Sequence, residues 1–320
     1  MTYSTESAFG RRFLAAESAG KCFYARTDLD RHRVATRTAK HTLVRVHTAL
    51  YARTAYWEHL TPVQRHLHVM RTLQDIHPEW VFCDVSAATV LGLQVPAWEI
   101  GRVNLLVKNV GQRQRANIVR HQLAQQDCIT HHGVAITRLA RTVFDCCQTR
   151  SLSTSLAVAD SALDAFRLTK ENYARQFEMY AATAVEFDRA VRVLKLARPQ
   201  SPGGAWSYAR GIMIQEGYAA PDVRAIARDP NDYRHGAFVD FRWRRPDGVM
   251  VYAQLTDNDR LFERGVGADA TALSACAARR TAKPIVVKGV ASMNLDFAQV
   301  LDRHSLVQTL DAYGVPRVRG

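Results

Sequence analysis

The spacing of apolar residues divides the chain into alternating helical and extended stretches. In the first sixty residues the spacing predicts a helix over 1–20 that ends at Gly20, followed by a short, strongly polar helix over 31–40. Two β-like runs come next, over 42–47 and 49–51, with a tight connection between them. The pattern therefore predicts two helices and a small hairpin at the start of the chain.

A clearer helix begins at Thr61, because Thr61 is a good N-cap, Pro62 suits the first helical position, and apolar residues then recur at helical spacing up to Pro78. A buried strand follows over 81–83, and we expect Asp84 or Ser86 to cap a helix of small residues over 87–92. Further strands are predicted over 103–107, 117–122 and 134–137, with a hairpin turn at His131-His132-Gly133. From 138 to about 198 the pattern is helical.

The last third starts with turn residues at 201–204, where we expect Ser201 to cap a helix that runs to Gly217. Strands are predicted over 223–227, 236–243 and 249–255, then an alanine-rich helix over 268–280, a strand over 284–287 and a final helix over 297–313. We therefore predict an α/β (α+β) fold with mixed sheets, divided into the regions 1–60, 61–198 and 201–320.

Composition places the chain among globular proteins, with 47% hydrophobic and 23% charged residues. No apolar run reaches the roughly 18 residues of a membrane span, and the first residues do not resemble a signal peptide. The six cysteines show no C-x-x-C spacing, which favours reduced thiols over a disulfide framework or a zinc site. We expect a cytoplasmic protein with no membrane partner, no bound metal and no cofactor.

Charge is distributed unevenly. Residues 1–53 hold ten Lys and Arg against four acids, a net charge of +6, whereas 201–320 hold sixteen against thirteen. A basic region of this kind indicates a polyanionic partner, nucleic acid first; the alternative is a solvated basic face. The expected phosphate contacts are Arg31, Arg33, Arg37, Lys40 and Arg45.

A basic helix that leads into a small hairpin is typical of the end of a winged helix-turn-helix, in which the hairpin forms the wing. The region 1–60 is therefore interpreted as a winged-helix-like DNA-binding region. The alternative is an ordinary packing unit of helices and strands without a ligand.

Four segments resemble one family, the AbiEi-type antitoxins and transcriptional regulators of actinobacteria. Residues 134–145, VAITRLARTVFD, are similar to that family's V-T-x-P-A-R-T-V-x-D stretch, and 157–163, AVADSAL, to its V-x-A-D-x-A-L helix. Residues 86–93 resemble its S-A-A-x-L-x-G-L motif, and 42–51 its L-V-R-V-R-R-G-V-Y-A wing. The order matches along nearly the whole chain. The resemblance implies a DNA-binding regulator, with a cognate toxin as a second partner.

Members of that family often carry a C-terminal domain similar to very-short-patch-repair endonucleases, of the PD-(D/E)xK fold. Its pattern is S-P-G-E at a helix start, V-D-F on a strand, and E-F-D or E-L-D on the next strand. Here the three segments are SPGG at 201–204, VDF at 239–241 and QLT at 254–256. Only Asp240 remains of the acids, because Gly204, Gln254 and Thr256 stand at the other positions.

A divalent cation such as Mg²⁺ needs several carboxylate oxygens, and phosphodiester hydrolysis needs the cation to activate water. Asp240 alone supplies too little negative charge, so we expect a pseudoenzyme with no catalytic residues. The alternative is a divergent metal-dependent DNA endonuclease in which Asp257 or Asp259 substitutes for the missing acids. A third hypothesis is a protein-interaction module without a nucleic-acid role.

Aromatic residues and arginines alternate in two parts of the last third. The aromatic ones are Trp206, Tyr208, Phe241 and Trp243, and the basic ones are Arg210, Arg242, Arg244 and Arg245. Such a mixture on one face of a sheet could stack on DNA and clamp it. We favour the other interpretation, in which the aromatic rings form a core and the arginines are solvated on the opposite face.

Overall fold

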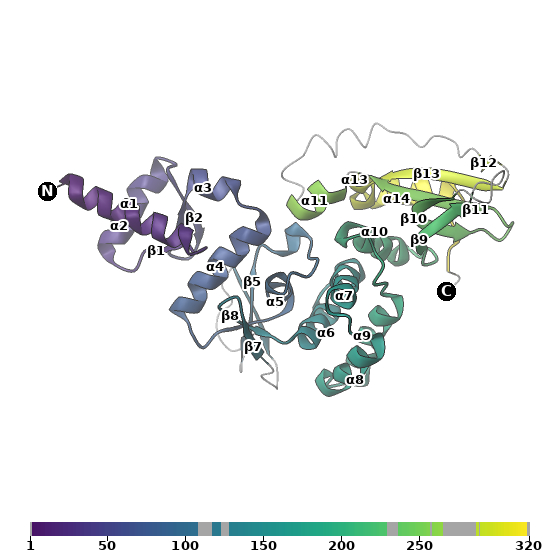
Figure 1. Cartoon of the computed structure of the whole chain (residues 1–320), viewed down its shortest axis with the longest axis horizontal. Coiled ribbons are helices and arrows are strands. Elements are labelled where there is room, and N and C mark those ends of the chain that lie inside the picture. The colour runs from purple at the N-terminus through teal and green to yellow at the C-terminus, as the bar shows by residue number, and fades with distance from the viewer. Residues whose placement is uncertain are drawn as a thin grey trace. The chain divides into compact units, whose positions relative to one another are not determined.

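The structure is a computed structural model that describes residues 2–107, 117–122, 128–228, 236–256, 258–264, 286–287 and 289–318. It contains helices together with antiparallel and mixed sheets, which confirms the predicted α/β class (Figure 1). The chain divides into two compact units. The first comprises Met1–Gly92 and Glu99–Arg138, and the second comprises Leu93–Trp98 and Leu139–Gly320.

The first unit begins with two helices and a small sheet. Its elements are α1 (Thr2–Ser18), β1 (Phe23–Tyr24), α2 (Asp28–Ala39), β2 (Leu43–His47), β3 (Leu50–Arg53) and α3 (Thr54–His59). The three strands are antiparallel in the order β1-β3-β2, so the predicted hairpin is confirmed. Helix α2 starts earlier than expected, because Thr27 and Asp30 form a capping box. Phe9, Phe13, Phe23 and Val34 form the core between the helices and this sheet.

A five-stranded mixed sheet and two helices complete the first unit. Its elements are α4 (Pro62–Ile76), β4 (Val81–Phe82), α5 (Asp84–Val90), β5 (Val103–Val107), β6 (Ile118–Gln122), β7 (Cys128–His131) and β8 (Val134–Thr137). The 3₁₀ turn η1 (Ala97–Glu99) begins in the second unit and ends at Glu99, where the chain returns to the first. The strand order is β6-β5-β4-β8-β7, with β4 parallel to β8 and β5 parallel to β6. Thr61 caps α4 as predicted.

Two local predictions in this region need correction. The hairpin turn at His131-His132-Gly133 is present, but its first strand, β7, was not predicted, because its side chains alternate between half-buried and exposed and leave no apolar pattern. The expected caps of α5 are also wrong. Cys83 is the N-cap and its side chain makes no capping bond, while Asp84 lies inside the helix and Ser86 Oγ accepts from Asn104 N at 2.9 Å.

The second unit has a helical layer and a sheet. The helices are α6 (Leu139–Thr149), α7 (Leu152–Phe166), α8 (Lys170–Tyr180), α9 (Ala184–Leu196) and α10 (Gly204–Gln215). Helix α10 lies between α7 and the sheet, as Figure 1 shows. Helices α7 and α10 approach each other closely, since a Cβ at Gly211 on α10 would lie 2.3 Å from Ser153 Cα on α7. Residues 139–198 therefore belong to the same unit as 201–320, whereas the sequence suggested a boundary between them.

The sheet of the second unit has the order β12-β13-β11-β10-β9. Its strands are β9 (Asp222–Arg228), β10 (Gly236–Arg244), β11 (Met250–Thr256), β12 (Val286–Val287) and β13 (Val290–Asp296); α11 (Asn258–Arg264), α13 (Phe297–Leu301) and α14 (Arg303–Ala312) accompany them. Strand β13 runs parallel to β11, and all other pairs are antiparallel. One face of the sheet packs on α10 and α13 through Phe241, Val251 and Leu295.

Three further predictions in this unit need correction. Ser201 does not cap α10, because Gly203 is the N-cap and Ser201 Oγ instead bonds to Ser207 at 2.8 Å. Strand β13 was missed, and the predicted final helix is two helices separated at Asp302. The predicted helix over 268–280 and the first two residues of the strand predicted over 284–287 lie outside the described residues, while the last two residues of that strand form β12. Among the described helices, none has the length and apolarity to cross a membrane.

Candidate functional site

The five basic residues expected to contact phosphates all lie on α2, on β2 or directly after α2, but their environments differ. Arg33 and Arg37 are half-buried, with guanidinium carbons 5.6 and 4.8 Å from the centroid of the Phe9 ring on α1. Arg37 also donates to Arg33 O at 3.1 Å. These two arginines therefore help to pack α1 against α2.

Among the described residues, ion pairs within residues 1–53 engage three of the ten cations of this region. Arg12 bonds through both terminal nitrogens to the buried carboxylate of Asp30, at 2.6 and 3.0 Å. This bidentate contact lowers the pKa of Asp30 and raises the pKa of Arg12. Arg53 makes a similar two-pronged contact with Glu17, and Arg31 pairs with Asp28 at 2.5 Å. Arg12 and Arg53 were not predicted to have these roles, and the sequence contains no signal for pairs 18 and 36 residues apart.

Lys40 and Arg45 are exposed, at the end of α2 and on β2 respectively. Arg45 Nε donates to His47 O at 3.4 Å. Together with Arg31, which is exposed although it pairs with Asp28, they form what we call the α2–β2 basic surface. Its cations present donors that can approach a phosphate backbone.

The connection between α1 and α2 departs from a standard helix-turn-helix. It covers residues 19–27 and contains β1, which pairs with β3. In a helix-turn-helix the two helices are joined by a turn of about 3–4 residues. The order helix, strand, helix, hairpin thus places a basic helix before a hairpin, but the connection between the two helices is longer than in that motif.

Asp240, the retained acid of the nuclease-like pattern, has a structural hydrogen bond. It lies on β10 with 8% exposure, and its Oδ2 accepts from Leu255 N on β11 at 2.7 Å. The regular pairing of the two strands ends at Phe241 and Ala253, so the carboxylate continues the cross-strand bonding beyond that point. Asp240 therefore has a structural role, because its carboxylate accepts a backbone N–H of the neighbouring strand.

Gly204, the second position of that pattern, lies in a crowded part of the core. A Cβ at Gly204 would lie 2.5 Å from the Phe262 ring and 2.9 Å from Gln94 Cβ. A glutamate at this position would have to displace the Phe262 ring from its packing. The backbone at 204 thus has no room for the carboxylate that the nuclease pattern places there.

The remaining positions of the pattern lie on or after β11. Gln254 and Thr256 are exposed, and Thr256 Oγ1 donates to Leu295 O at 3.3 Å. Asp257 lies outside the described residues, and Asp259 lies in α11 with a side chain that is not described. Within the described part of the chain, no group of three or more His, Cys, Asp or Glu side chains is placed to hold a metal ion.

The alternating aromatic and arginine residues separate as the favoured interpretation expected. Phe241 and Trp243 are buried in the core, while Arg242 and Arg244 alternate with them on the opposite face of β10. Arg242 pairs there with Asp222 at 2.8 Å. Arg210 differs, because it is almost fully buried.

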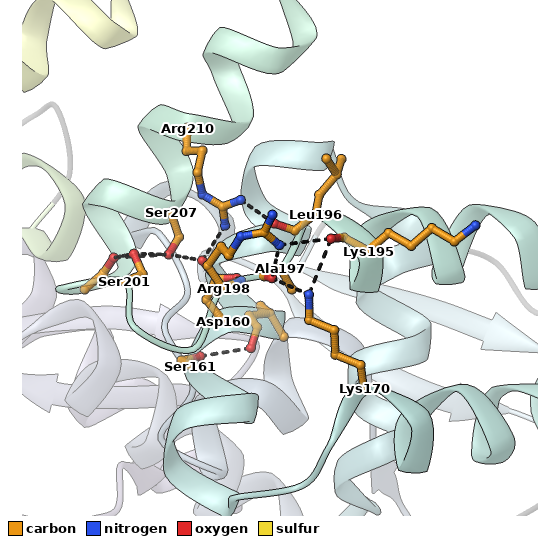
Figure 2. Close-up of polar contacts among 12 residues, drawn as sticks. Asp160, Ser161, Lys170, Lys195, Leu196, Ala197, Arg198, Ser201, Ser207 and Arg210 are labelled. Carbon is orange, nitrogen blue, oxygen red and sulfur yellow. Dashed lines mark hydrogen bonds and ion pairs between the residues drawn. The ribbon is translucent and has the colours of Figure 1, made fainter. Parts of the chain in front are cut away.

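Arg210 belongs to a buried polar network that joins α7, α9 and α10, shown in Figure 2. Its guanidinium donates to Asp160 Oδ2 at 2.6 Å, and the same oxygen accepts from Ser207 Oγ at 2.6 Å. The other carboxylate oxygen accepts from Arg198 N at 2.6 Å. Burial raises the pKa of Asp160, and these donors oppose that effect by stabilising the carboxylate.

The same network closes the end of α9. Lys170 Nζ donates to Ala197 O at 2.6 Å, and Arg198 donates to Ala197 O at 2.9 Å and to Lys195 O at 3.1 Å (Figure 2). Arg210 donates to Leu196 O. Three cations therefore satisfy the last carbonyls of the helix, where its dipole is negative. The arrangement is a structural clamp, and the sequence had suggested only that Asp160 lies on a helix.

A second buried network lies in the first unit. His66 Nε2 lies 3.0 Å from Ser86 Oγ, which also accepts from Asn104 N. Burial lowers the pKa of His66 to about 4, so its ring is neutral near pH 7 and forms a hydrogen bond with the Ser86 hydroxyl. Ser86 is fully buried, so this contact holds α4, α5 and β5 together and offers no accessible nucleophile.

In comparisons with known proteins, no family model matches the chain, and no curated protein matches it. The basis for a function is therefore the residues and their arrangement.

Proposed function

We propose that the protein is a DNA-binding regulator similar to the AbiEi-type antitoxins, whose second unit keeps the outline of a nuclease domain without catalysing hydrolysis. The observation that carries the proposal is the α2–β2 basic surface: Arg31, Lys40 and Arg45 are exposed on a helix and hairpin of a region with net charge +6. A helix followed by a wing is an arrangement that many proteins use to contact DNA.

The second unit supports the non-catalytic part of the proposal. Asp240 bonds to a backbone N–H, Gly204 has no space for a carboxylate, and Gln254 is an amide. A site of this composition lacks the negative charge that binds a hard divalent cation. The resemblance also implies a cognate toxin, and we propose such a protein as a second partner.

The first test measures the salt dependence of DNA binding. Each neutralised phosphate contributes roughly 0.9 to the slope of log K against log salt concentration. We predict that Lys40→Ala with Arg45→Ala weakens binding and reduces the slope by about 2. We choose Lys40 and Arg45 because both are exposed, whereas Arg37 packs on Phe9 and its loss would disturb the fold.

The matched control removes the same charge from the second unit. Arg175 on α8 and Lys195 on α9 are exposed, and the double variant Arg175→Ala, Lys195→Ala should keep the wild-type slope. Fluorescence anisotropy with a labelled duplex at several salt concentrations measures both. An equal loss in the two variants would show that only net charge matters, and an unchanged slope in the first would exclude the α2–β2 basic surface.

A further inference from the structure

A second cluster of cations lies in the second unit, around a cavity of about 410 Å³. Four arginines line it: Arg150 after α6, Arg189 and Arg192 on α9, and Arg303 at the start of α14. The residues that line the cavity include no aspartate or glutamate. We call this site the four-arginine cavity.

Two contacts hold these side chains beside the cavity. Arg189 donates to Arg150 O at 3.4 Å, and Arg303 pairs with Glu216 at 2.8 Å, next to the lining residue Gln215. Glu216 can compensate one of the four charges. Arg189 and Arg192, three residues apart on α9, add two further positive charges beside the cavity, and like charges at short range repel one another unless an anion lies between them.

The rest of the lining suits a ligand that has an apolar part as well as a charged part. Half-buried Leu152 and Ile214 supply apolar surface, and Val193, at 4% exposure, adds little to it. Leu152 is also the first residue of α7, so the positive end of that helix dipole lies at the cavity. The combination is one of concentrated positive charge beside an apolar wall.

We propose that the four-arginine cavity binds a nucleotide that carries two or more phosphate groups. Guanidinium groups bind phosphate oxygens through paired hydrogen bonds, and four of them match a chain of phosphates better than a single one. The apolar wall contacts the base. The volume lies within the range of small-molecule sites, and it is too small to admit a DNA duplex. This inference does not depend on the DNA-binding proposal.

The experiment compares four probes: inorganic pyrophosphate, AMP, ADP and ATP. Thermal denaturation of the full chain is measured with each probe, with NaCl at matched ionic strength as the reference, and affinities are measured by calorimetry. We expect the melting temperature to rise in the order AMP, ADP, ATP, because a ligand bound only by the folded state stabilises it. ADP should bind at least about tenfold more tightly than AMP and more tightly than pyrophosphate.

The variant Arg189→Gln with Arg192→Gln tests the location. Both arginines are exposed, so the protein should fold, which circular dichroism checks. We expect its affinity for ATP to fall by at least about tenfold. The control, Arg175→Gln with Lys195→Gln, removes equal charge from α8 and α9 outside the cavity lining and should bind ATP as wild type does. The single variant Arg303→Gln, on another element, should also weaken ATP binding.

Other outcomes would overturn the proposal. Unchanged ATP affinity in the Arg189, Arg192 variant, or an equal loss in the control, would exclude the cavity as the site. Equal affinity for pyrophosphate and ADP would exclude a contact between the apolar wall and a base, and with it a nucleotide. If no probe binds and the Arg189, Arg192 variant loses DNA affinity, these arginines contact DNA and not a nucleotide. That result would not test the α2–β2 basic surface, which the Lys40, Arg45 variant tests.

Discussion

Asp160 and Arg210 show how much one buried side chain depends on its partner. Both are at most 3% exposed, and each oxygen of the carboxylate accepts at least one hydrogen bond. Removing one member of a buried ion pair leaves an uncompensated charge, which costs about 3–5 kcal/mol. We predict that Arg210→Met lowers the free energy of unfolding by an amount in this range, measured by urea denaturation.

The control for Arg210 is the exposed pair of Arg242 and Asp222, with side-chain exposures of 34% and 67%. Exposed pairs contribute about 0–1 kcal/mol, so Arg242→Met should have a small effect. Adding Asp160→Asn to Arg210→Met should recover part of the loss, because the unpaired charge is then gone. An additive loss in the double variant would contradict the ion-pair explanation.

His66 makes stability depend on pH. Burial lowers its pKa to about 4 in the folded state, against about 6.5 when unfolded. Between pH 4 and pH 6.5 the His66 ring is protonated in the unfolded chain but not in the folded one. The contribution of His66 to the free energy of unfolding, which is fully present above pH 6.5, is therefore lost as the pH falls toward 4. We predict that the free energy of unfolding falls by about 2 kcal/mol between pH 7 and pH 5 through His66 alone.

Urea denaturation of wild type and His66→Gln at both pH values measures this contribution. His68, whose pKa is also lowered by burial, acts in the same direction and remains in both proteins. The variant should therefore keep a smaller pH dependence than wild type. Exposed His32 serves as the control, and His32→Gln should leave the dependence unchanged. Equal pH dependence in wild type and His66→Gln would contradict a neutral buried ring.

At the scale of elements, the contact between α7 and α10 is limited by Gly211. A Cβ at this position would lie 2.3 Å from Ser153 Cα, so the two helix backbones would have to separate. Overpacking of this kind costs about 1–3 kcal/mol. We predict that Gly211→Ala lowers the free energy of unfolding by at least that much. Gly10 on α1 has no neighbour within 4 Å of its Cβ position, so Gly10→Ala should be neutral or stabilising by up to about 1 kcal/mol.

Both glycine variants are measured by urea denaturation, with circular dichroism to confirm helix content. A stabilising Gly211→Ala would show that α7 and α10 are further apart than described. The close approach also explains why the helical region before residue 198 does not form a unit of its own. Its helix α7 shares a core with α10 and the sheet through Ala157.

For the whole molecule, we predict no hydrolysis of DNA with Mg²⁺ or Mn²⁺. The described residues offer no cluster of metal-binding side chains, and Asp240 accepts a hydrogen bond from Leu255 N. The measurement is incubation with supercoiled plasmid, beside the variant Asp240→Ala. Loss of a buried hydrogen-bond acceptor should cost that variant about 1–3 kcal/mol of stability, so its fold is checked first. If wild type nicks the plasmid and a folded Asp240→Ala variant does not, the non-catalytic proposal is contradicted and the hypothesis of a divergent endonuclease is supported.

Local chemistry was enough to predict many elements of this protein. Thr61 and Pro62 begin α4 as expected, because capping and the φ angle of proline act within one turn. The hairpin of β2 and β3 and the buried strands β4, β5 and β8 follow from alternation and turn residues. The predictions failed where local signals were weak or misleading, as for β7, for the caps of α5 and α10, and at Asp302.

The composition of the candidate sites was likewise visible in the sequence, but their geometry was not. The basic excess of residues 1–53 can be counted, yet only the fold shows that Arg12 and Arg53 are bound to Asp30 and Glu17 while Lys40 and Arg45 are exposed. These pairings join residues far apart in the chain, and nothing in local spacing specifies them.

The tertiary structure also decided which cations meet. Arg150, Arg189 and Arg303 come from three separate parts of the chain, and no pattern in the sequence connects them, yet they line one cavity. Gly204 could be recognised as a missing acid from the sequence, but the lack of space beside Phe262 could not. The physical reason is the same in each case: helix and strand preferences act between neighbouring residues, whereas close packing and charge pairing depend on distances that exist only after the chain has folded.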